Sequence, residues 1–390
     1  MKKQKILFVH DHLFLGGAAK AALRMRKTCQ ELGYQTFSIH GDRASIAPWP
    51  SLSIHGKPSF FGKIRGLYLC DGNKAQNRER RALNAFQRHL KQKQYDLIWF
   101  QNIAGAIKWG WSTSWVNEAA RHARTIITMH DMFYLGFEKS YAWDEPVRRT
   151  FFAGLGDKEL DELFKTKRLF VNAPSDWLRG VAQELYGIKA GKLLVPMADD
   201  QFATEAKTKP SGEPTTYLVG SDNLEDERKN ILPLLRLARE TGILERTNSK
   251  IICLGRNLPE DLCSGRIVPL GHVENPSDYR KLFQQVHFLL HPSLIDNFPL
   301  IIQDSLALGC PVVALDRGGV AESVRNGITG RLLSEMTRET LKMVFTANAQ
   351  MTPDSYNQLS QSCLSFAQSN YSEESLKPVY ANYLLGVCPN

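Results

Sequence analysis

The chain has 390 residues and a net charge of +9, with 49 Lys and Arg against 40 Asp and Glu. This length exceeds what one hydrophobic core usually supports, so we expect two domains. No run of about 18 apolar residues occurs, which excludes a bilayer-spanning helix. The start of the chain lacks the long apolar segment and cleavage site of a signal peptide, so we expect a cytoplasmic protein.

Cysteine spacing and charge distribution narrow the functional classes further. The seven cysteines are scattered and never form a CxxC pair, which is typical of reduced thiols and argues against a zinc site or a disulfide framework. Residues 1–190 contain 30 Lys and Arg against 17 Asp and Glu, whereas the remainder contains 19 against 23. The basic character therefore belongs to the first half of the chain.

Short apolar, β-rich runs alternate with helical patterns along most of the chain, which predicts βα units around parallel sheets. The first series begins with the strand Lys5–His10, passes Gly16-Gly17 and enters a helix for which Gly33 is the expected C-cap glycine. Ser175 precedes the amphipathic run DWLRGVAQEL and is the expected N-cap of its helix. The other predicted strands of this series are QTFSIH, DLIWFQN, TIITMHD and RLFVNAPS.

A polar stretch, Ala206–Pro214, interrupts the pattern, and TTYLVG (Thr215–Gly220) restarts it. We predict one helix after Lys229 and another between Pro299 and Leu308. The predicted strands of this second series are KIICLG, RIVPLG, VHFLLHPS and PVVALD.

The sequence therefore predicts an α/β protein with two doubly wound, Rossmann-like parallel-sheet domains that face each other across a cleft. We expect these domains at residues 1–200 and 201–365, with a helical tail at residues 366–390 that packs back toward the first domain. Ligands of doubly wound sheets sit beyond the carboxyl ends of the strands. Functional residues are therefore expected directly after predicted strands.

The strongest functional signal lies at residues 291–323, HPSLIDNFPLIIQDSLALGCPVVALDRGGVAES. Asp296 and Asp304 are eight positions apart, a little over two helical turns, so both can point toward one side of the helix between them. A helix N-terminus offers free N–H groups and carboxylates accept hydrogen bonds from hydroxyls, which suits a negatively charged, polyhydroxylated ligand. A helix-start acid and a surface acid are the alternative explanation.

This stretch resembles the Glu-x7-Glu region of glycosyltransferase family 4, a family of retaining enzymes with the GT-B fold. The resemblance also reaches GGAAKAAL, ITMHD, FVNAPSDWL and YLVG with RKN, and it thins between about Asp42 and Gln94. It implies an acceptor-side first domain and a nucleotide-sugar-binding second domain. The matching phrases, in order, are Pro292-Ser293, Asp296 to Phe298, Asp304, Gly309-Cys310-Pro311-Val312-Val313, Gly318-Gly319 with Glu322, and Asn326-Gly327 with Gly330.

Carried over by position, the resemblance implies that Asp296 and the backbone of Asn297 to Leu300 hold hydroxyls of the donor sugar, and that Asp304 holds the ribose. Both acids are usually Glu in the family. Asp is shorter by one methylene, which bears on donor preference and on activity itself. The residues expected to bind the donor are Gly16, Gly17, Gly220, Asn297, Phe298, Pro299, Leu300 and Asp304.

Arg228 and Lys229 follow the strand Thr215–Gly220, where two cations would meet the diphosphate oxygens of the donor. Charge-assisted contacts of this kind also stabilise a departing diphosphate, so no metal is required, and no Asp-x-Asp pair suggests one. The family commonly places its Arg several residues before the Lys, which makes Lys229 the safer assignment. A solvated charge run is the alternative.

His130 and Gly16-Gly17 also follow predicted strands. The glycine backbone could approach a phosphate or an acceptor hydroxyl closely, although a tight turn explains the pair equally well. A lone histidine is more often structural, but the resemblance implies that His130 touches the donor sugar near the reacting carbon. The expected catalytic residues are therefore His130, Asp296, Lys229 and Arg228.

The stretch Lys74–Lys93 is strongly basic, and Leu83, Phe86 and Leu90 share one helical face. Such a helix could lie on an anionic membrane or hold an anionic, lipid-linked acceptor. An ordinary surface helix with a core stripe is the alternative. Nucleic-acid binding is disfavoured because no RNA- or DNA-reading motif accompanies the charge.

The sequence thus predicts a metal-independent, retaining glycosyltransferase that moves a hexose-type sugar from a UDP- or GDP-sugar to an acceptor hydroxyl, without a further cofactor. The expected context is synthesis of a bacterial polysaccharide, glycolipid or glycoconjugate, in the cytoplasm or peripherally at the inner face of the membrane. Two alternatives stay open: a GT-B sugar-nucleotide epimerase, and a catalytically silent partner subunit suggested by the two Glu-to-Asp departures.

Overall fold

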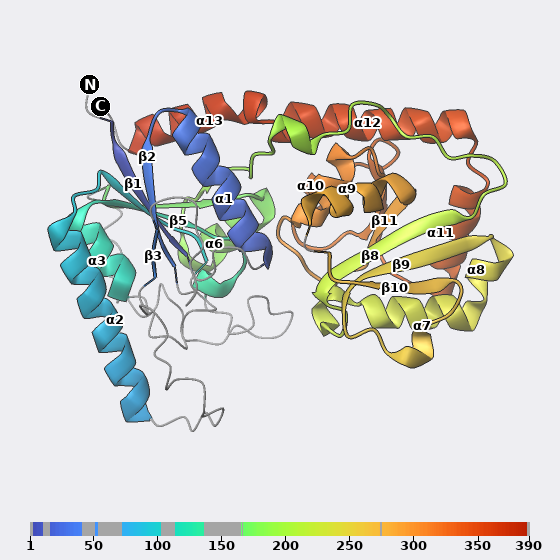
Figure 1. Ribbon diagram of the computed structural model, residues 1–390, viewed down its shortest axis with the longest axis horizontal. Helices are drawn as coiled ribbons and strands as arrows, with labels where there is room; N and C mark the ends of the chain where they lie inside the picture. The colour runs from blue at the N-terminus through green and yellow to red at the C-terminus, as the bar shows by residue number, and fades with distance from the viewer. Residues whose placement is uncertain are drawn as a thin grey trace. The chain divides into compact units, whose positions relative to one another are not determined.

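The computed structural model describes residues 3–10, 16–40, 51–53, 72–102, 114–135, 165, 167–273 and 275–387 (Figure 1). The chain divides into two compact units, Met1–Pro196 with Leu376–Asn390 and Met197–Ser375. The division lies after Pro196, where residue 200 was expected. The C-terminal segment joins the first unit from Leu376, where residue 366 was expected.

The first unit is built around a parallel sheet of seven described strands in the order β3-β2-β1-β4-β5-β6-β7. Its central strands are continuous apolar runs, as expected when a sheet is covered on both faces. The strands are β1 (Lys5–His10), β2 (Gln35–His40), β3 (Ser51–Ser53), β4 (Leu97–Phe100), β5 (Arg124–Thr128), β6 (Leu169–Ala173) and β7 (Gly191–Lys192). The helices and the short 3-10 turn are α1 (Gly16–Glu31), α2 (Gly72–Gln92), α3 (Ser114–His122), η3 (Phe133–Leu135), α6 (Asp176–Tyr186) and α13 (Glu373–Val387).

Capping residues set the ends of α1 and α6. Gly33 has a φ of +93°, and the following Tyr34 N–H donates to Cys29 O at 3.1 Å, which closes α1 as a Schellman motif. The Ser175 hydroxyl accepts a hydrogen bond from Leu178 N at 3.0 Å and caps α6. Both predicted caps are confirmed.

The C-terminal helix α13 completes the core of the first unit. Leu376, Tyr380 and Leu384 are buried in one apolar cluster with Trp99 of β4. The Tyr380 hydroxyl also donates to Leu194 O at 2.8 Å, which satisfies a polar group inside this cluster. The last helix of the chain is therefore part of the first unit's core.

The second unit contains a parallel sheet of six described strands in the order β10-β9-β8-β11-β12-β13. The chain builds β8, β9 and β10 outward on one side and β11, β12 and β13 outward on the other, so the winding reverses between β8 and β11. The strands are β8 (Thr215–Asn223), β9 (Ser249–Arg256), β10 (Ile267–Gly271), β11 (Phe288–His291), β12 (Val312–Leu315) and β13 (Gly330–Leu333). The α-helices are α7 (Ile231–Thr241), α8 (Ile243–Arg246), α9 (Pro276–Gln285), α10 (Leu300–Ala307), α11 (Arg338–Ala349) and α12 (Pro353–Tyr371). The 3-10 turns are η4 (Asp199–Gln201), η5 (Glu227–Lys229), η6 (Glu260–Leu262) and η7 (Val320–Glu322).

Close packing fixes α10 in the second unit. The Ser360 hydroxyl of α12 donates to Gly309 O at 2.6 Å, just beyond the end of α10. Gly309 has a φ of +66°, and a Cβ there would lie 2.6 Å from the same hydroxyl oxygen. Only glycine allows this approach, so the end of α10 is held against α12.

The predicted fold class is confirmed, because both units are α/β structures around doubly wound parallel sheets. Every predicted strand is present, and β3, β7 and β13 were not predicted because these segments of two to four residues carry little periodic signal. Among the described residues, no helix is long and apolar enough to cross a membrane.

Two adjacent leucines of α13 test its role in the core. Leu384 is fully buried, whereas Leu385 is 46% exposed. We expect Leu384→Ala to lower the free energy of unfolding by about 2–5 kcal/mol, because it leaves a cavity in the core of the first unit. Leu385→Ala is the matched control and should change it by less than about 0.5 kcal/mol in urea unfolding. Equal, small losses for both variants would show that α13 is not part of this core.

Candidate functional site

The candidate site lies at the point where the winding of the second sheet reverses. Strands β8 and β11 are parallel neighbours there, with Tyr217 paired to Phe288 and Leu218 to Leu289. Their carboxyl ends therefore meet at one edge of the sheet. Residues 224–230 follow β8, and residues 292–299 follow β11. Ligands of doubly wound sheets bind at such switch points.

The two loops after these strands are joined by hydrogen bonds. Leu294 N donates to Arg228 O at 2.9 Å, and Nη1 of Arg228 donates to Ile295 O at 3.2 Å. Asn230 Nδ2 donates to Pro292 O at 3.2 Å. The two loops therefore form one framework, and side chains from both have fixed relative positions.

Local turn chemistry positions Arg228 and Lys229. Asp226 caps the short turn η5 by accepting a hydrogen bond from Arg228 N at 3.0 Å. The next residue after the turn, Asn230, has a φ of +55°, a left-handed conformation that Asn tolerates well, and it leads directly into α7. The two cations are therefore on a tight turn rather than on a solvated helix face.

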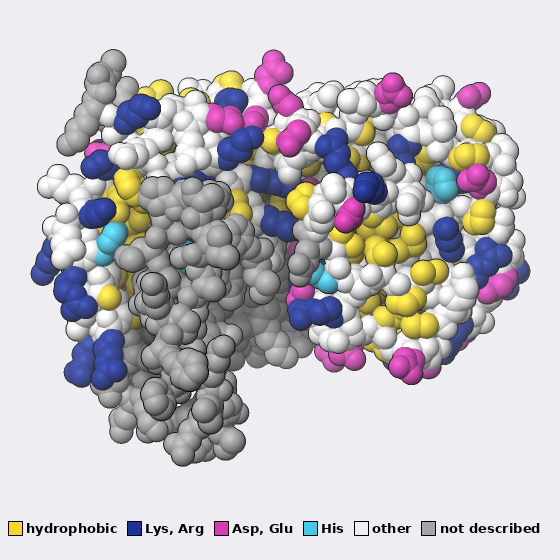
Figure 2. Space-filling model, viewed as in Figure 1, with side chains coloured by type: hydrophobic (Ala, Val, Ile, Leu, Met, Phe, Trp, Pro, Cys, Tyr) yellow, Lys and Arg dark blue, Asp and Glu magenta, His cyan; other side chains and the backbone are white. Residues whose placement is uncertain are grey.

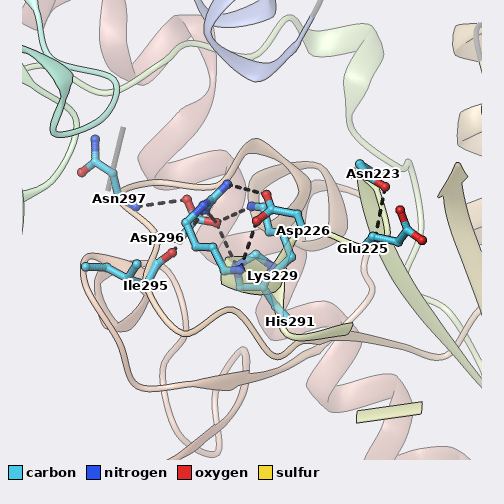
Figure 3. Close-up of polar contacts among 9 residues, drawn as sticks. Asn223, Glu225, Asp226, Lys229, His291, Ile295, Asp296 and Asn297 are labelled. Atoms are coloured by element: carbon cyan, nitrogen blue, oxygen red, sulfur yellow. Dashed lines mark hydrogen bonds and ion pairs between the residues drawn. The ribbon is translucent and has the colours of Figure 1, made fainter. Parts of the chain in front are cut away.

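Asp296 is the centre of a cluster of charged side chains (Figure 3). Its Oδ2 lies 2.6 Å from Lys229 Nζ, 3.4 Å from Arg228 Nη1 and 3.3 Å from His291 Nε2. Its Oδ1 accepts a hydrogen bond from Asn297 N at 3.1 Å. The side chain is only 8% exposed, so these contacts replace almost all of its hydration.

The electrostatics of the cluster favour a charged Asp296 beside a neutral histidine. Burial alone would raise the pKa of Asp296, but the charge of Lys229, the contact with His291 and the charge of Arg228 outweigh it. They hold the pKa of Asp296 well below its ordinary value, so it is a carboxylate at neutral pH. Burial lowers the pKa of His291 and outweighs the neighbouring carboxylate, so its imidazole is uncharged at pH 7.

A glycine pair fixes the backbone of Asp296. Gly319 N donates to Asp296 O at 2.9 Å. The preceding Gly318 has a φ of +64°, and a Cβ there would overlap with the same carbonyl oxygen. The Gly318-Gly319 sequence after β12 is therefore required for a close approach that holds Asp296 in place.

The predicted donor residues after Asp296 divide into two groups. The side chain of Asn297 is fully buried, and the Phe298 ring packs edge-on against Tyr371 with centroids 5.9 Å apart, so these two anchor the loop. Pro299 is the residue before α10, and Leu300 is its first residue. Pro299 and Leu300 are partly exposed, so contacts from this segment to a ligand would come from the start of α10.

Asp304 and Gly220 both lie in close contact with neighbouring elements of the second unit. Asp304 lies inside α10, is 8% exposed and accepts a hydrogen bond from the Tyr279 hydroxyl of α9 at 3.3 Å, so it is not a surface acid. A Cβ on Gly220 would lie 2.8 Å from Cδ1 of Ile301. Gly220, predicted to bind the donor, therefore makes room for the first turn of α10 against β8.

Of the predicted site residues of the first unit, His130 lies just after a strand, whereas Gly16 and Gly17 lie at the start of a helix. His130 follows β5, and its Nε2 lies 2.7 Å from Gln101 Oε1. Burial and then the nearby charge of His10 lower the pKa of His130 to about 4, so it is neutral at pH 7. Gly16 and Gly17 open α1, and among the described residues no atom lies within 4 Å of a Cβ placed on either. That His130 and these glycines face the sugar at Asp296 stays a prediction.

The basic helix α2 has both a core stripe and a charged face. Phe86 and Leu90 are buried, and Phe86 stacks on Trp115 of α3 with centroids 4.3 Å apart. Lys and Arg side chains gather along this helix on the face shown in Figure 2. The side chains of residues 72–79 lie outside the described part of the chain. Membrane or acceptor binding by α2 stays a prediction.

Sequence reasoning missed two residues of the charged cluster, Asp226 and His291. Asp226 stands two residues before Arg228, a spacing that suits a capping turn, and His291 is the last residue of β11, directly before the Pro-Ser phrase. In the described part of the chain, no group of three or more His, Cys, Asp or Glu side chains is placed to hold a metal ion.

Comparison with known proteins relates this cluster to glycosyl transferases. Residues 213–344, which contain the whole cluster, match the family model described as "Glycosyl transferases group 1". Part of the chain is 30% identical over 129 residues to an uncharacterized glycosyltransferase, MJ1607, of Methanocaldococcus jannaschii, and 35% identical over 101 residues to a D-inositol 3-phosphate glycosyltransferase of Mycobacterium tuberculosis. These matches cover 28% and 26% of this chain, and 33% and 17% of those proteins. The chain therefore spans a third or less of the length of these relatives.

Solved structures are similar along nearly the whole chain. A glycosyltransferase from Rickettsia africae aligns with a TM-score of 0.69 and 16% identity, covering 100% of both chains. Anabaena Alr3699/HepE in complex with UDP-glucose aligns with a TM-score of 0.67 and 14% identity over 98% of this chain and 100% of that chain. WaaG, a glycosyltransferase involved in lipopolysaccharide biosynthesis, aligns with a TM-score of 0.66 and 14% identity over 98% and 100%. The fold is GT-B.

Two glycines with similar backbone conformation test how the GT-B site is fixed. Gly318 and Gly327 have φ values of +64° and +76°, and only Gly318 lacks room for a Cβ. We expect Gly327→Ala to lower the free energy of unfolding by about 1–2 kcal/mol through left-handed strain alone. Gly318→Ala should lower it by at least about 1 kcal/mol more in urea unfolding, because the Asp296 loop must shift. Equal losses would contradict the close approach at Asp296.

Proposed function

We propose that the protein is a retaining glycosyltransferase of family 4 that transfers a hexose-type sugar from a UDP- or GDP-sugar to an acceptor hydroxyl. The observation that carries this proposal is the fixed pair of cations, Arg228 and Lys229, at the switch point of a GT-B unit. The match of residues 213–344 to the glycosyl transferase group 1 model supports it. The UDP-glucose bound by HepE, a protein of the same fold, supports a nucleotide sugar as the ligand class.

In this proposal Lys229 and Arg228 hold the diphosphate of the donor. Both are partly exposed, with side chains 17% and 20% accessible, so a ligand can reach them. Charge-assisted hydrogen bonds from two cations stabilise the charge that develops on the departing diphosphate. The reaction then needs no metal ion for this purpose.

The remaining predicted residues complete the donor site. Asp296 and the backbone of Asn297 to Leu300 would hold sugar hydroxyls, and Asp304 would hold the ribose. Gly16 and Gly17 would approach the diphosphate, and His130, neutral at pH 7, would touch the sugar near the reacting carbon. Closure of the two units around the donor would bring these groups together.

The proposed reaction uses no protein nucleophile. The bond between the anomeric carbon and the diphosphate oxygen breaks, and the acceptor oxygen bonds to that carbon from the face that the diphosphate leaves. The acceptor's proton passes to the departing diphosphate, and the anomeric configuration is retained. Catalysis then depends on positioning and on stabilising the leaving group.

We further propose that the acceptor belongs to a bacterial polysaccharide, glycolipid or glycoconjugate, and that the reaction takes place in the cytoplasm or at the inner face of the membrane. The described role of WaaG in lipopolysaccharide biosynthesis supports this class of acceptor. The exposed basic residues of α2 would then contact an anionic membrane or an anionic acceptor.

A thermal-shift panel of UDP- and GDP-sugars tests the ligand class. At least one nucleotide sugar should raise the Tm, because a ligand at about 100 times its Kd stabilises a native site by about 2.7 kcal/mol. No shift with any member at millimolar concentration would contradict the proposal. Analysis of products with and without acceptor separates transfer from epimerisation.

Lys229→Ala tests the proposed diphosphate contact. We expect the Kd of the best nucleotide sugar to rise about 10- to 100-fold, since a hydrogen bond to a charged group is lost. Calorimetry measures this, and Lys281→Ala is the control because Lys281 pairs with Asp278 on the exposed side of α9 in the same unit. Near-normal binding by Lys229→Ala, with an unchanged fold, would remove Lys229 from the site.

A further inference from the structure

The two cations of the proposed diphosphate site already have internal anions. Lys229 Nζ lies 2.6 Å and Arg228 Nη1 lies 3.4 Å from Asp296 Oδ2. Arg228 Nη2 lies 3.4 Å from Asp226 Oδ2. Among the described side chains, two positive and two negative charges therefore lie together beside a neutral His291. A diphosphate that reaches these cations must compete with Asp296.

Asp296 cannot leave the site when it loses this competition. Gly319 N donates a hydrogen bond to its carbonyl oxygen. The backbone of Gly318 packs so closely against the same oxygen that a Cβ on Gly318 would overlap with it. The side chain is short, and the hydrogen bonds between the two loops keep its backbone beside Lys229. Because the backbone is held and the side chain is short, a displaced carboxylate stays close to the cations.

A buried carboxylate that loses its cations is strongly disfavoured unless other donors replace them. Among the described residues, Asn297 N and His291 Nε2 remain beside it, but of the contacts given above for this carboxylate the one with Lys229 is the shortest, at 2.6 Å. A diphosphate offers only acceptors and leaves this deficit in place. A sugar diphosphate offers hydroxyl donors next to the phosphates, so it can satisfy the cations and the carboxylate together.

We propose that Asp296 is a specificity-determining residue that exchanges Lys229 and Arg228 for sugar hydroxyls, so that the site distinguishes a sugar nucleotide from the nucleoside diphosphate. The proposal rests on the proposed function. When the intact donor binds, its phosphates pair with Lys229 and Arg228, and its sugar hydroxyls donate hydrogen bonds to Asp296 in their place. After transfer the sugar is gone, the carboxylate regains Lys229, and release of the nucleoside diphosphate is favoured.

The closing experiment measures Kd by calorimetry for UDP-glucose and UDP, and for GDP-mannose and GDP. Wild type should bind one sugar nucleotide more tightly than its nucleoside diphosphate. Asp296→Asn should bind the nucleoside diphosphate about 10-fold more tightly than wild type and the sugar nucleotide no more tightly, because a neutral amide does not hold the cations. The preference for the sugar nucleotide then falls about 10-fold or more.

Asp226→Asn is the matched control. Asn keeps the cap of η5 but removes a negative charge from the same cations, and it has no expected contact with the sugar. Both ligands should then bind more tightly by a similar factor, and their ratio should stay within about 2-fold. Asp296→Ser, with a smaller neutral side chain, should tighten nucleoside diphosphate binding as Asp296→Asn does and provides the same test if that variant does not fold.

The outcomes separate this inference from the function on which it rests. If wild type binds a sugar nucleotide but neither neutral variant of Asp296 binds the nucleoside diphosphate more tightly, the exchange is wrong and the donor site stands. The exchange is also overturned if the ratio of the two Kd values changes as much in Asp226→Asn as in Asp296→Asn, because the effect is then only one of net charge. If wild type binds no nucleotide or sugar nucleotide, the proposed function is wrong and the exchange is overturned with it.

Discussion

The ion pair between Lys229 and Asp296 joins two loops that are 67 residues apart in the chain and follow neighbouring strands of one sheet. A carboxylate on a side chain that is 8% exposed remains charged only because cations and donors surround it. Three nearby features hold the pair in place: the capped turn that presents Lys229, the hydrogen bonds between the two loops, and the close approach of Gly318 and Gly319 to Asp296. The site is therefore rigid before any ligand chemistry is considered.

This rigidity originates in the sheet. Because β8 and β11 are parallel neighbours, their carboxyl ends are at the same edge of the sheet. The short loops that follow them therefore come into contact directly. Helix α10 then starts beside them and is held at its two ends, by Gly220 against Ile301 and by Gly309 against Ser360. The positions of the charged side chains follow from strand order and close backbone packing more than from the charges themselves.

The sequence predicted what depends on local pattern and missed what depends on long-range pairing. Apolar runs and caps such as Gly33 and Ser175 are set by neighbours in the chain, and they were predicted correctly. Strand-end positions also indicated Lys229 and Asp296 separately. Nothing local indicates that they pair with each other, or that His291 joins them, because those contacts exist only once β8 and β11 are adjacent. The family resemblance indicated only that Asp296 contacts a sugar. It did not indicate that Asp296 is the counter-ion of Lys229 and Arg228.

The two aspartates at which the sequence departs from the Glu-x7-Glu pattern that it resembles are held differently. Asp304 is fixed within α10 and meets the Tyr279 hydroxyl, so its reach is set by the helix. Asp296 is fixed by its own backbone, and its carboxylate reaches Lys229 at 2.6 Å because the two loops are already bonded together. From the same backbone, a side chain longer by one methylene would extend past this contact or have to fold back, at a cost in side-chain conformation. The shorter acid therefore fits the spacing of these loops, and the departure from the family pattern is compatible with an intact site.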